Sequence, residues 1–380
     1  MARNAPGVCF VLQLHEWNRN EGWQYRQVDL HEFFPPRSPE NIEFVSADAE
    51  ICIIFANTDL LSKCEPCRSY LIDEFSVPKY WWSQAHQNSN GYFGCRDGTR
   101  YISTWTYFEM KQLEGGDEYS WYKLNVYIQW DRSTHKTIVL AFDTDPVVAH
   151  RLLNLLRDPD PDCLCFPFWF YPHLLSEVAR IEESAVWAIR DEVRAIETQV
   201  VSRGRPKPNY RHMHDIARHG IHVTETLDVA VETLQRMLDR HDRLLQKDRS
   251  DDIHSQLQFF DSFIASMRCR SVSNDKRLLN EIQLAFNTVA QHDASTSLKV
   301  AVVALIFLPP TFVSAIFSMS FFNFSPDKGW FISDKFWLYW VFAVPTTIVT
   351  AAGWYYLRRY GMPELPNLKR EAKRSQAFPV

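Results

Sequence analysis

Glycine is the residue that this chain has least of relative to ordinary proteins. Its 380 residues include 12 glycines, whereas an average usage near 7% would give about 27. No GxGxxG, GxxxxGK[ST], HExxH or GxSxG pattern occurs in the sequence. These patterns form the phosphate-binding loops, zinc-binding helices and nucleophile turns of many enzymes. Their absence removes the most familiar enzymatic classes, and we expect the chain not to be an enzyme.

The chain also lacks an excess of basic residues. It has 41 Lys and Arg against 46 Asp and Glu, so a surface for binding nucleic acid is not expected. The first residues, MARNAPGVCFVLQLHEW, show neither the pattern of a cleaved secretory signal nor that of a mitochondrial transit peptide. We therefore expect a large cytosolic N-terminal part in which the eight dispersed cysteines are reduced.

Charge is missing altogether from two long runs near the C-terminus. Residues 300–326 contain no Asp, Glu, Lys or Arg, and neither do residues 336–357. Each run is long enough to cross a bilayer, which takes about 20 apolar residues. Because a short polar hinge separates them, the sequence predicts a two-helix transmembrane hairpin at residues 298–357, with spans at about 298–317 and 336–357.

The flanking charges predict the orientation of this hairpin. The tail at residues 358–380 carries six basic residues against two acidic ones, whereas the hinge carries two of each. Basic flanks stay on the cytoplasmic side of a membrane, so the tail is expected inside and the hinge outside. Two spans then return the N-terminal part to the inside. The prediction is an integral, multi-pass protein embedded in membrane lipid, with both termini cytoplasmic.

Small residues recur at a spacing of three and four along the first run. Small residues let membrane helices approach closely, and polar ones face a partner or a wet cavity. Pro309 and Pro310 lie in the same run and remove backbone N–H groups, which membranes tolerate inside protein or near water. Two interpretations remain open, a packing face and a pore lining. The row, named here the small-residue stripe, consists of Ser297, Ala301, Ala304, Leu308, Thr311, Ala315 and Ser318.

The N-terminal part, residues 1–170, mixes strand-like and helical patterns. β-Branched and aromatic residues predict strands at residues 8–17, 50–56, 100–108, 121–130 and 137–142, and residues 147–156 read as a helix. The expected fold is an α/β or α+β domain. Its dense aromatics could build either a binding groove or the core; they are Tyr80, Trp81, Trp82, Tyr92 and Phe93.

Residues 171–297 predict a stalk of long helices. Helical periodicity covers residues 173–200 and 210–246, and a third helix opens at Asp251 or Asp252, with no Gly or Pro before Pro309. If that helix continues without a break from Asp252 to Phe317, it would be roughly 100 Å long at 1.5 Å per residue. Such a helix must pack on the preceding helices or on copies of itself. In the second helix one face carries His212, Asp215, His219 and His222, which suits either a metal sensor or a solvated surface.

The passage LKVAVVALIFLPPTFVSAIFSMSFFNF, residues 298–324, together with the long helix that leads into it, resembles the CorA family of divalent-cation transporters, in particular its divergent fungal members. The family pattern has a Pro followed by Thr-Phe within the first span and Gly-Met-Asn at its outer end. Pro309, Thr311 and Phe312 match the first part. Ser318, Met319 and Ser320 stand where Gly-Met-Asn is expected.

This resemblance implies a funnel-shaped homopentamer with an α/β cytoplasmic domain. Its long helix would line a pore for Mg²⁺ or a related divalent ion, and no cofactor other than this cargo is implied. Ser320 would meet the hydrated ion at the outer mouth, and Thr311 would form an inner polar ring. Leu308, Ala304 and Ala301 would form an apolar constriction. A Ser hydroxyl has a shorter reach than an Asn amide, so a non-conducting regulatory or scaffold protein on the same frame is the alternative.

Overall fold

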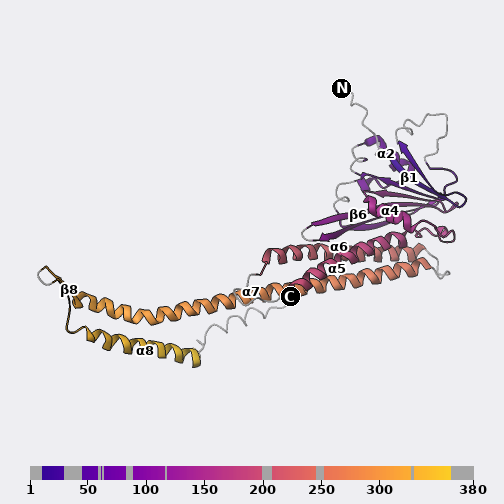
Figure 1. Cartoon of the computed structure of the whole chain (residues 1–380). Coiled ribbons are helices and arrows are strands. Elements are labelled where there is room, and N and C mark those ends of the chain that lie inside the picture. Colours follow the sequence, from indigo (N-terminus) through magenta and orange to yellow (C-terminus); the bar gives the residue numbers. More distant parts are fainter. Residues whose placement is uncertain are drawn as a thin grey trace, which may run out of the picture. The chain divides into compact units, whose positions relative to one another are not determined.

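The structure is a computed structural model, and it describes residues 11–29, 45–58, 61, 64–82, 89–115, 118–198, 208–244, 252–326 and 329–360. The described chain forms two compact units, residues up to 198 with 208–284, and residues 285–360. One helix, α7 (Asp252–Phe321), begins in the first unit and continues into the second (Figure 1). The basic tail beyond Tyr360 lies outside the described residues.

A seven-stranded mixed sheet forms the N-terminal half of the first unit. The strand order is β2-β1-β3-β7-β6-β5-β4, and every neighbouring pair is antiparallel except β3 and β7. The five predicted strands are confirmed as β1, β3, β5, β6 and β7, while β2 and β4 were not predicted. The strands are β1 (Val11–Asn18), β2 (Gly22–Asp29), β3 (Ile51–Ala56), β4 (Gly91–Asp97), β5 (Tyr101–Gly115), β6 (Glu118–Asp131) and β7 (Thr137–Phe142).

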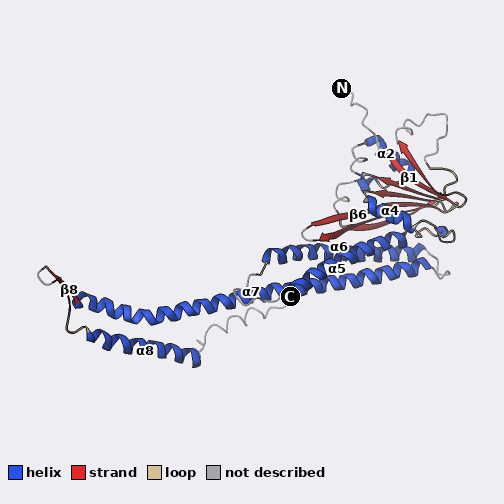
Figure 2. Cartoon of the chain, viewed as in Figure 1, coloured by secondary structure: helices blue, strands red, loops and turns tan. Residues whose placement is uncertain are grey.

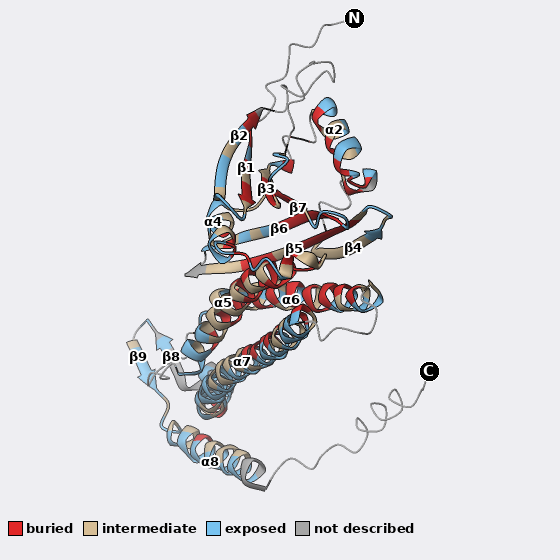
Figure 3. Ribbon diagram, turned by 90° about the vertical axis from the view of Figure 1, so that its right-hand side faces the viewer, coloured by how far each residue is buried: buried red, intermediate tan, exposed pale blue. Residues whose placement is uncertain are grey.

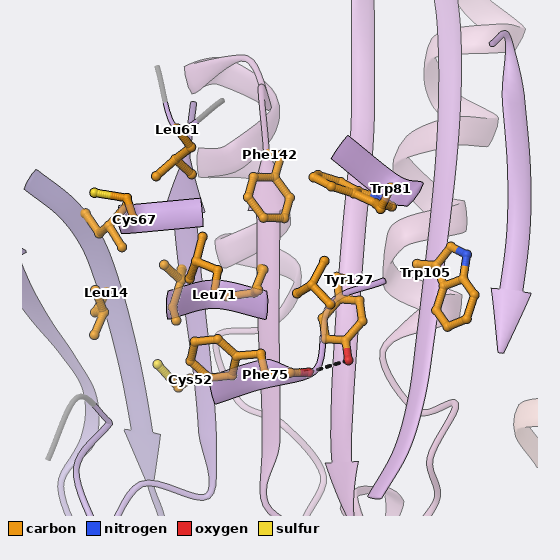
Figure 4. Close-up of a cluster of buried hydrophobic side chains, with 14 of the residues drawn as sticks. Leu14, Cys52, Leu61, Cys67, Leu71, Phe75, Trp81, Trp105, Tyr127 and Phe142 are labelled. Carbon is orange, nitrogen blue, oxygen red and sulfur yellow. Dashed lines mark hydrogen bonds between the residues drawn. The ribbon is translucent and has the colours of Figure 1, made fainter. Parts of the chain in front are cut away.

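Helix α2 (Glu65–Phe75) covers one face of this sheet (Figures 1 and 3). Its buried side chains Cys67, Leu71 and Phe75 lie among apolar residues of the strands (Figure 4). The hydroxyl of Tyr127 in β6 donates to the backbone carbonyl of Phe75 at 2.6 Å. Both faces of the sheet are covered, so the first four residues of β3 are all buried, as is usual for a central strand in a parallel pairing.

The aromatic residues that could have lined a groove belong to the core instead. Trp81 is 1% exposed, and its ring lies 4.6 Å from that of Phe142. Tyr92 and Phe93 are adjacent in β4 and therefore point to opposite faces. Tyr92 stacks on Tyr107 on one side, and Phe93 contacts Phe168 and Tyr171 on the other. The side chain of Tyr80 lies outside the described residues.

Three long helices follow, and the first two of them pack on the other face of the sheet (Figure 2). The chain reaches them through α4 (Pro146–Leu155), and they are α5 (Tyr171–Glu197), α6 (Tyr210–Leu244) and the start of α7. The Asn274 amide of α7 donates to the carbonyl of Val186 in α5 at 3.2 Å. The Thr224 hydroxyl of α6 donates to the Asp275 carboxylate at 2.9 Å. The predicted helices are confirmed, and α7 runs unbroken for 70 residues.

The histidine face of α6 contacts the sheet rather than solvent alone. The rings of His219 and His222 lie 5.1 and 5.8 Å from those of Tyr119 and Trp121. The Lys111 ammonium lies 3.0 Å from Nδ1 of His222, and burial lowers the pKa of both groups. A cation already occupies this position, so the metal-sensing interpretation of this face is not supported.

Candidate functional site: the exposed stripe of the membrane-length helix

Helix α7 is long and apolar enough to cross a membrane. Within the described residues it is the one helix that satisfies both conditions, with a mean hydropathy of 2.0 in its most apolar window. The second predicted span forms helix α8 (Trp337–Tyr360), whose many Trp and Tyr side chains lower its hydropathy. The helix is therefore present where expected, and its passage through the membrane stays a prediction.

The link between α7 and α8 is a small hairpin where the sequence suggested only a polar hinge. Strands β8 (Phe322–Ser325) and β9 (Gly329–Ile332) pair antiparallel, and Gly329 adopts a left-handed φ of 67° that suits glycine. The rings of Phe324 and Trp330 lie 5.4 Å apart, and Trp330 is 75% exposed. Exposed aromatic rings at this position suit the interface between a membrane and water.

One side of α7 faces α8. The Tyr339 hydroxyl donates to the carbonyl of Pro310 at 3.4 Å. Val313 of α7 is 7% exposed and Ala343 of α8 is 2% exposed, which marks the buried contact between the two helices. Most other side chains of both helices in this unit are exposed (Figure 3).

The small-residue stripe lies on a different side of α7. All seven of its residues are exposed, and Leu308 at the centre is 67% exposed. At 3.6 residues per turn, Leu308 is about 100° from Pro309 and about 140° from Val313 around the helix. The cationic side chain of Lys299 follows Ser297 by two residues, which places it about 160° away from the stripe. The stripe is thus an uncharged face that α8 does not cover.

Thr311 gives this face its polarity. Pro309 and Pro310 have no N–H, so the carbonyls of Leu305 and Ile306, which lie outside the stripe, lose their usual helical donors. The Thr311 hydroxyl donates to the carbonyls of Phe307 and Leu308, at 2.9 and 2.8 Å. Because its one proton is used within the helix, the Thr311 oxygen can otherwise act only as an acceptor. An acceptor on an exposed residue suits a cation or the water around it.

Ser318 repeats this arrangement at the outer end of the stripe. Its hydroxyl oxygen lies 3.5 Å from the carbonyl of Ala315, and the side chain is exposed. Met319 and Ser320 continue the helix, but their side chains lie outside the described residues. From Ala301 to Ser318 the stripe extends about 25 Å along the axis at 1.5 Å per residue, close to the roughly 30 Å of a hydrocarbon core.

The chain thus combines an α/β domain, a layer of long helices and a helix of membrane length with an uncharged, exposed face. The chain belongs to the CorA-like Mg²⁺ transporter protein family, whose family model matches residues 135–359. This is a family of transporters rather than enzymes, with Mg²⁺ as its cargo. The match begins just before β7, so most of the sheet precedes it.

Known proteins resemble the chain to different extents. The "Notoamide biosynthesis cluster protein M'" of Aspergillus versicolor is 30% identical over 287 residues, which are 65% of this chain and 62% of that relative's length. The CorA magnesium transporter of Methanocaldococcus jannaschii superposes with a TM-score of 0.57 at 14% identity, covering 93% of this chain and 99% of the other. The full-length CmaX protein superposes with a TM-score of 0.60 at 13% identity, covering 93% of this chain and 100% of the other. At such identities these two structures show the fold.

Proposed function

We propose that the chain is a CorA-like membrane channel for divalent cations, Mg²⁺ or a related ion, with a pore lined by the small-residue stripe of α7. The observation that carries this proposal is the exposed Thr311, whose hydroxyl proton is bonded within the helix, in the middle of an exposed, uncharged helix face. Within the chain, α8 contacts another side of the helix and leaves the stripe uncovered. Family membership supports the ion class.

The stripe contains no charged ligand, so the ion is expected to keep its water. Mg²⁺ loses its hydration shell reluctantly, and hydroxyl or carbonyl oxygens can accept hydrogen bonds from that shell without displacing it. Ser320 and Ser318 are proposed as the outer polar ring and Thr311 as the inner one. Leu308, Ala304 and Ala301 are proposed as the apolar constriction between Thr311 and the cytoplasm.

This pore needs several copies of the chain, because one helix face cannot enclose an ion. We propose a homo-oligomer, a homopentamer by analogy with the family resemblance, in which the stripes face a common axis. The proposed boundaries are a cytoplasmic domain at 1–170, a stalk at 171–297, a membrane hairpin at 298–357 and a cytoplasmic tail at 358–380. Both termini lie on the cytoplasmic side in this arrangement.

Ion flux into liposomes tests the proposal. Purified full-length protein is reconstituted with a Mg²⁺-sensitive dye inside the vesicles, and an inward Mg²⁺ gradient is applied. We expect flux, and we expect Leu308→Ser to change it several-fold. The matched control is Ile306→Ser, which alters a side chain of the same size that is 45% exposed and about 160° around the helix from Leu308. Full insertion without flux of any divalent ion would contradict the proposal.

A non-conducting scaffold is the second candidate, and the Ser318-Met319-Ser320 sequence is the observation that favours it. A serine ring has a shorter reach to hydrated ions than an asparagine ring. The name of the Aspergillus versicolor relative refers to a biosynthetic cluster and specifies no ion. Co-assembly with a conducting family member, combined with no flux from this chain alone, would support this second candidate.

A further inference from the structure

Two histidines and an aspartate come together where α6 ends and α7 begins. His241 and Asp242 lie in the last turn of α6, and His254 lies in the first turn of α7. One possible ligand atom from each lies within 4.8 Å of the other two. Nδ1 of His254 is 3.1 Å from the Asp242 carboxylate and 3.4 Å from Nδ1 of His241. The cluster belongs to the first compact unit and is separate from the stripe.

The nitrogen atoms of the two imidazoles face one another. Their ring centroids are 5.4 Å apart whereas their Nδ1 atoms are 3.4 Å apart, so both nitrogens lie between the two rings. A neutral imidazole carries a single proton. One proton on His254 Nδ1 can be donated either to His241 or to Asp242. A cation between the three groups would be held by one atom of each.

The two ligand separations at His254 fit a transition-metal site. In a tetrahedral zinc site with ligand bonds of 2.0–2.1 Å, the ligands are separated by about 3.3 Å. The two separations at His254, 3.1 and 3.4 Å, bracket this value. Imidazole nitrogens favour zinc and similar metals, whereas Mg²⁺ prefers an all-oxygen site. Three protein ligands leave a fourth position for water.

The groups around the cluster limit how it can bind. The amide nitrogen of Gln258 lies 2.8 Å from Nε2 of His254. Turning this amide by 180° places its oxygen there, where it would accept the proton that Nε2 carries when Nδ1 binds metal. His241 is 2% exposed, and its ring packs edge-on against Phe168 at 5.1 Å.

We propose that His241, Asp242 and His254 form a binding site for Zn²⁺ or a similar transition metal that ties the end of α6 to the start of α7. This site is distinct from the proposed pore in its residues and in its metal preference. Because α7 is the helix that continues into the membrane-length segment, the site offers a regulatory input that responds to a metal other than the Mg²⁺ cargo.

Metal binding by the purified full-length protein tests this proposal without reference to ion flux. The protein is kept in detergent under reducing conditions, cleared of metal with a chelator and titrated with Zn²⁺ by calorimetry. We expect His254→Gln and Asp242→Asn each to remove one bound equivalent or weaken its binding at least tenfold. Asp242→Asn keeps the shape of a side chain that is 61% exposed, so it reports on binding even where His254→Gln impairs folding.

The matched control is His292→Gln. His292 also lies on α7 beside an aspartate, Asp293, at 3.5 Å, and it belongs to no three-residue group in the described part of the chain. This variant should bind as many equivalents as the unaltered protein. Co²⁺ supplies a second readout, because a tetrahedral site with two imidazoles gives intense visible absorption that both test variants should lose. Unchanged stoichiometry and unchanged Co²⁺ spectra in both test variants would overturn the proposal.

Discussion

The hydroxyl of Tyr339 in α8 donates to the backbone carbonyl of Pro310 in α7, with 3.4 Å between the two oxygens. This bond joins the two helices at the level where the prolines interrupt the hydrogen bonding of α7. Removing the hydroxyl in Tyr339→Phe should lower the stability of the protein by about 0.5–1 kcal/mol, as is typical of hydrogen bonds between membrane helices. The measurement is thermal unfolding in detergent.

The ring of Tyr339 provides the comparison for this variant. It stacks on Phe336 with centroids 5.9 Å apart. Tyr339→Leu removes both the hydroxyl and the ring, so it should destabilise the protein more than Tyr339→Phe does. If the two variants unfold at the same temperature as the unaltered protein, the contact between α7 and α8 does not contribute to stability.

Restoring the family's outer motif should increase ion flux. The double variant Ser318→Gly/Ser320→Asn recreates Gly-Met-Asn at the C-terminal end of the small-residue stripe. The Asn amide has a longer reach and both donor and acceptor atoms for the ion's water, so Mg²⁺ flux into liposomes should rise several-fold. Ser325→Asn, just beyond the motif in β8, is the control and should leave flux unchanged. Equal flux from all three proteins would argue against an outer ring at this position.

A buried carboxyl in α5 should make the stability of the protein depend on pH. Burial raises the pKa of Glu182 to about 8 from an ordinary value of 4.5. The folded state therefore holds a proton that the unfolded state releases, and stability should fall as the pH rises from about 5 to about 8, by up to roughly 1.4 kcal/mol per pH unit. Glu182→Gln should remove this dependence and raise the unfolding temperature at pH 8.

The neighbouring residue Glu183 is half-buried and offers a matched control. Glu183→Gln should keep the pH dependence of the unaltered protein. A stability profile of Glu182→Gln that still declines between pH 5 and pH 8 to the same extent would show that another group is responsible.

Asp131 should affect stability in the opposite pH range. Burial alone would raise its pKa, but hydrogen bonds from Ser133, Arg100 and Thr134 outweigh burial and lower the pKa to about 2. The contribution of the Asp131 carboxylate to the stability of the folded protein is thus complete above pH 4 and is lost as the pH falls toward 2. Asp131→Asn should destabilise the protein by about 1–3 kcal/mol at pH 7 and flatten the acid limb of a denaturation profile. The control Asp48→Asn, at an exposed position, should change neither the stability at pH 7 nor the acid limb of the profile.

Apolar runs and helical periodicity made most of the fold predictable from the sequence. The runs at 50–56 and 137–142 are almost continuously apolar, and they became the central strands β3 and β7. The two prolines did not end α7, because a membrane-length apolar run can carry a helix through them. The resemblance to the CorA family, drawn from the long helix together with residues 298–324, is confirmed by the family match.

The missed elements have weaker local signals. Strand β2 has exposed polar residues such as Gln24 and Gln27 because it lies at an edge of the sheet. Strand β4 is the other edge and contains two glycines. The metal cluster joins His241 to His254 across 13 positions and two helices, and only the packing of those helices brings the residues together. No local spacing rule could have found it.

The β8–β9 hairpin also bears on how the protein would enter a membrane during its synthesis. It occupies most of residues 322–336, the link between α7 and α8. Under the proposed topology the end of α7 and the start of α8 lie on the same side of the bilayer, so the two helices insert as a pair and this link is translocated. Its charged residues, Asp327, Lys328, Asp334 and Lys335, sum to zero. The membrane potential consequently does no net electrical work on the segment, and insertion is expected to proceed equally well in energised and de-energised membranes.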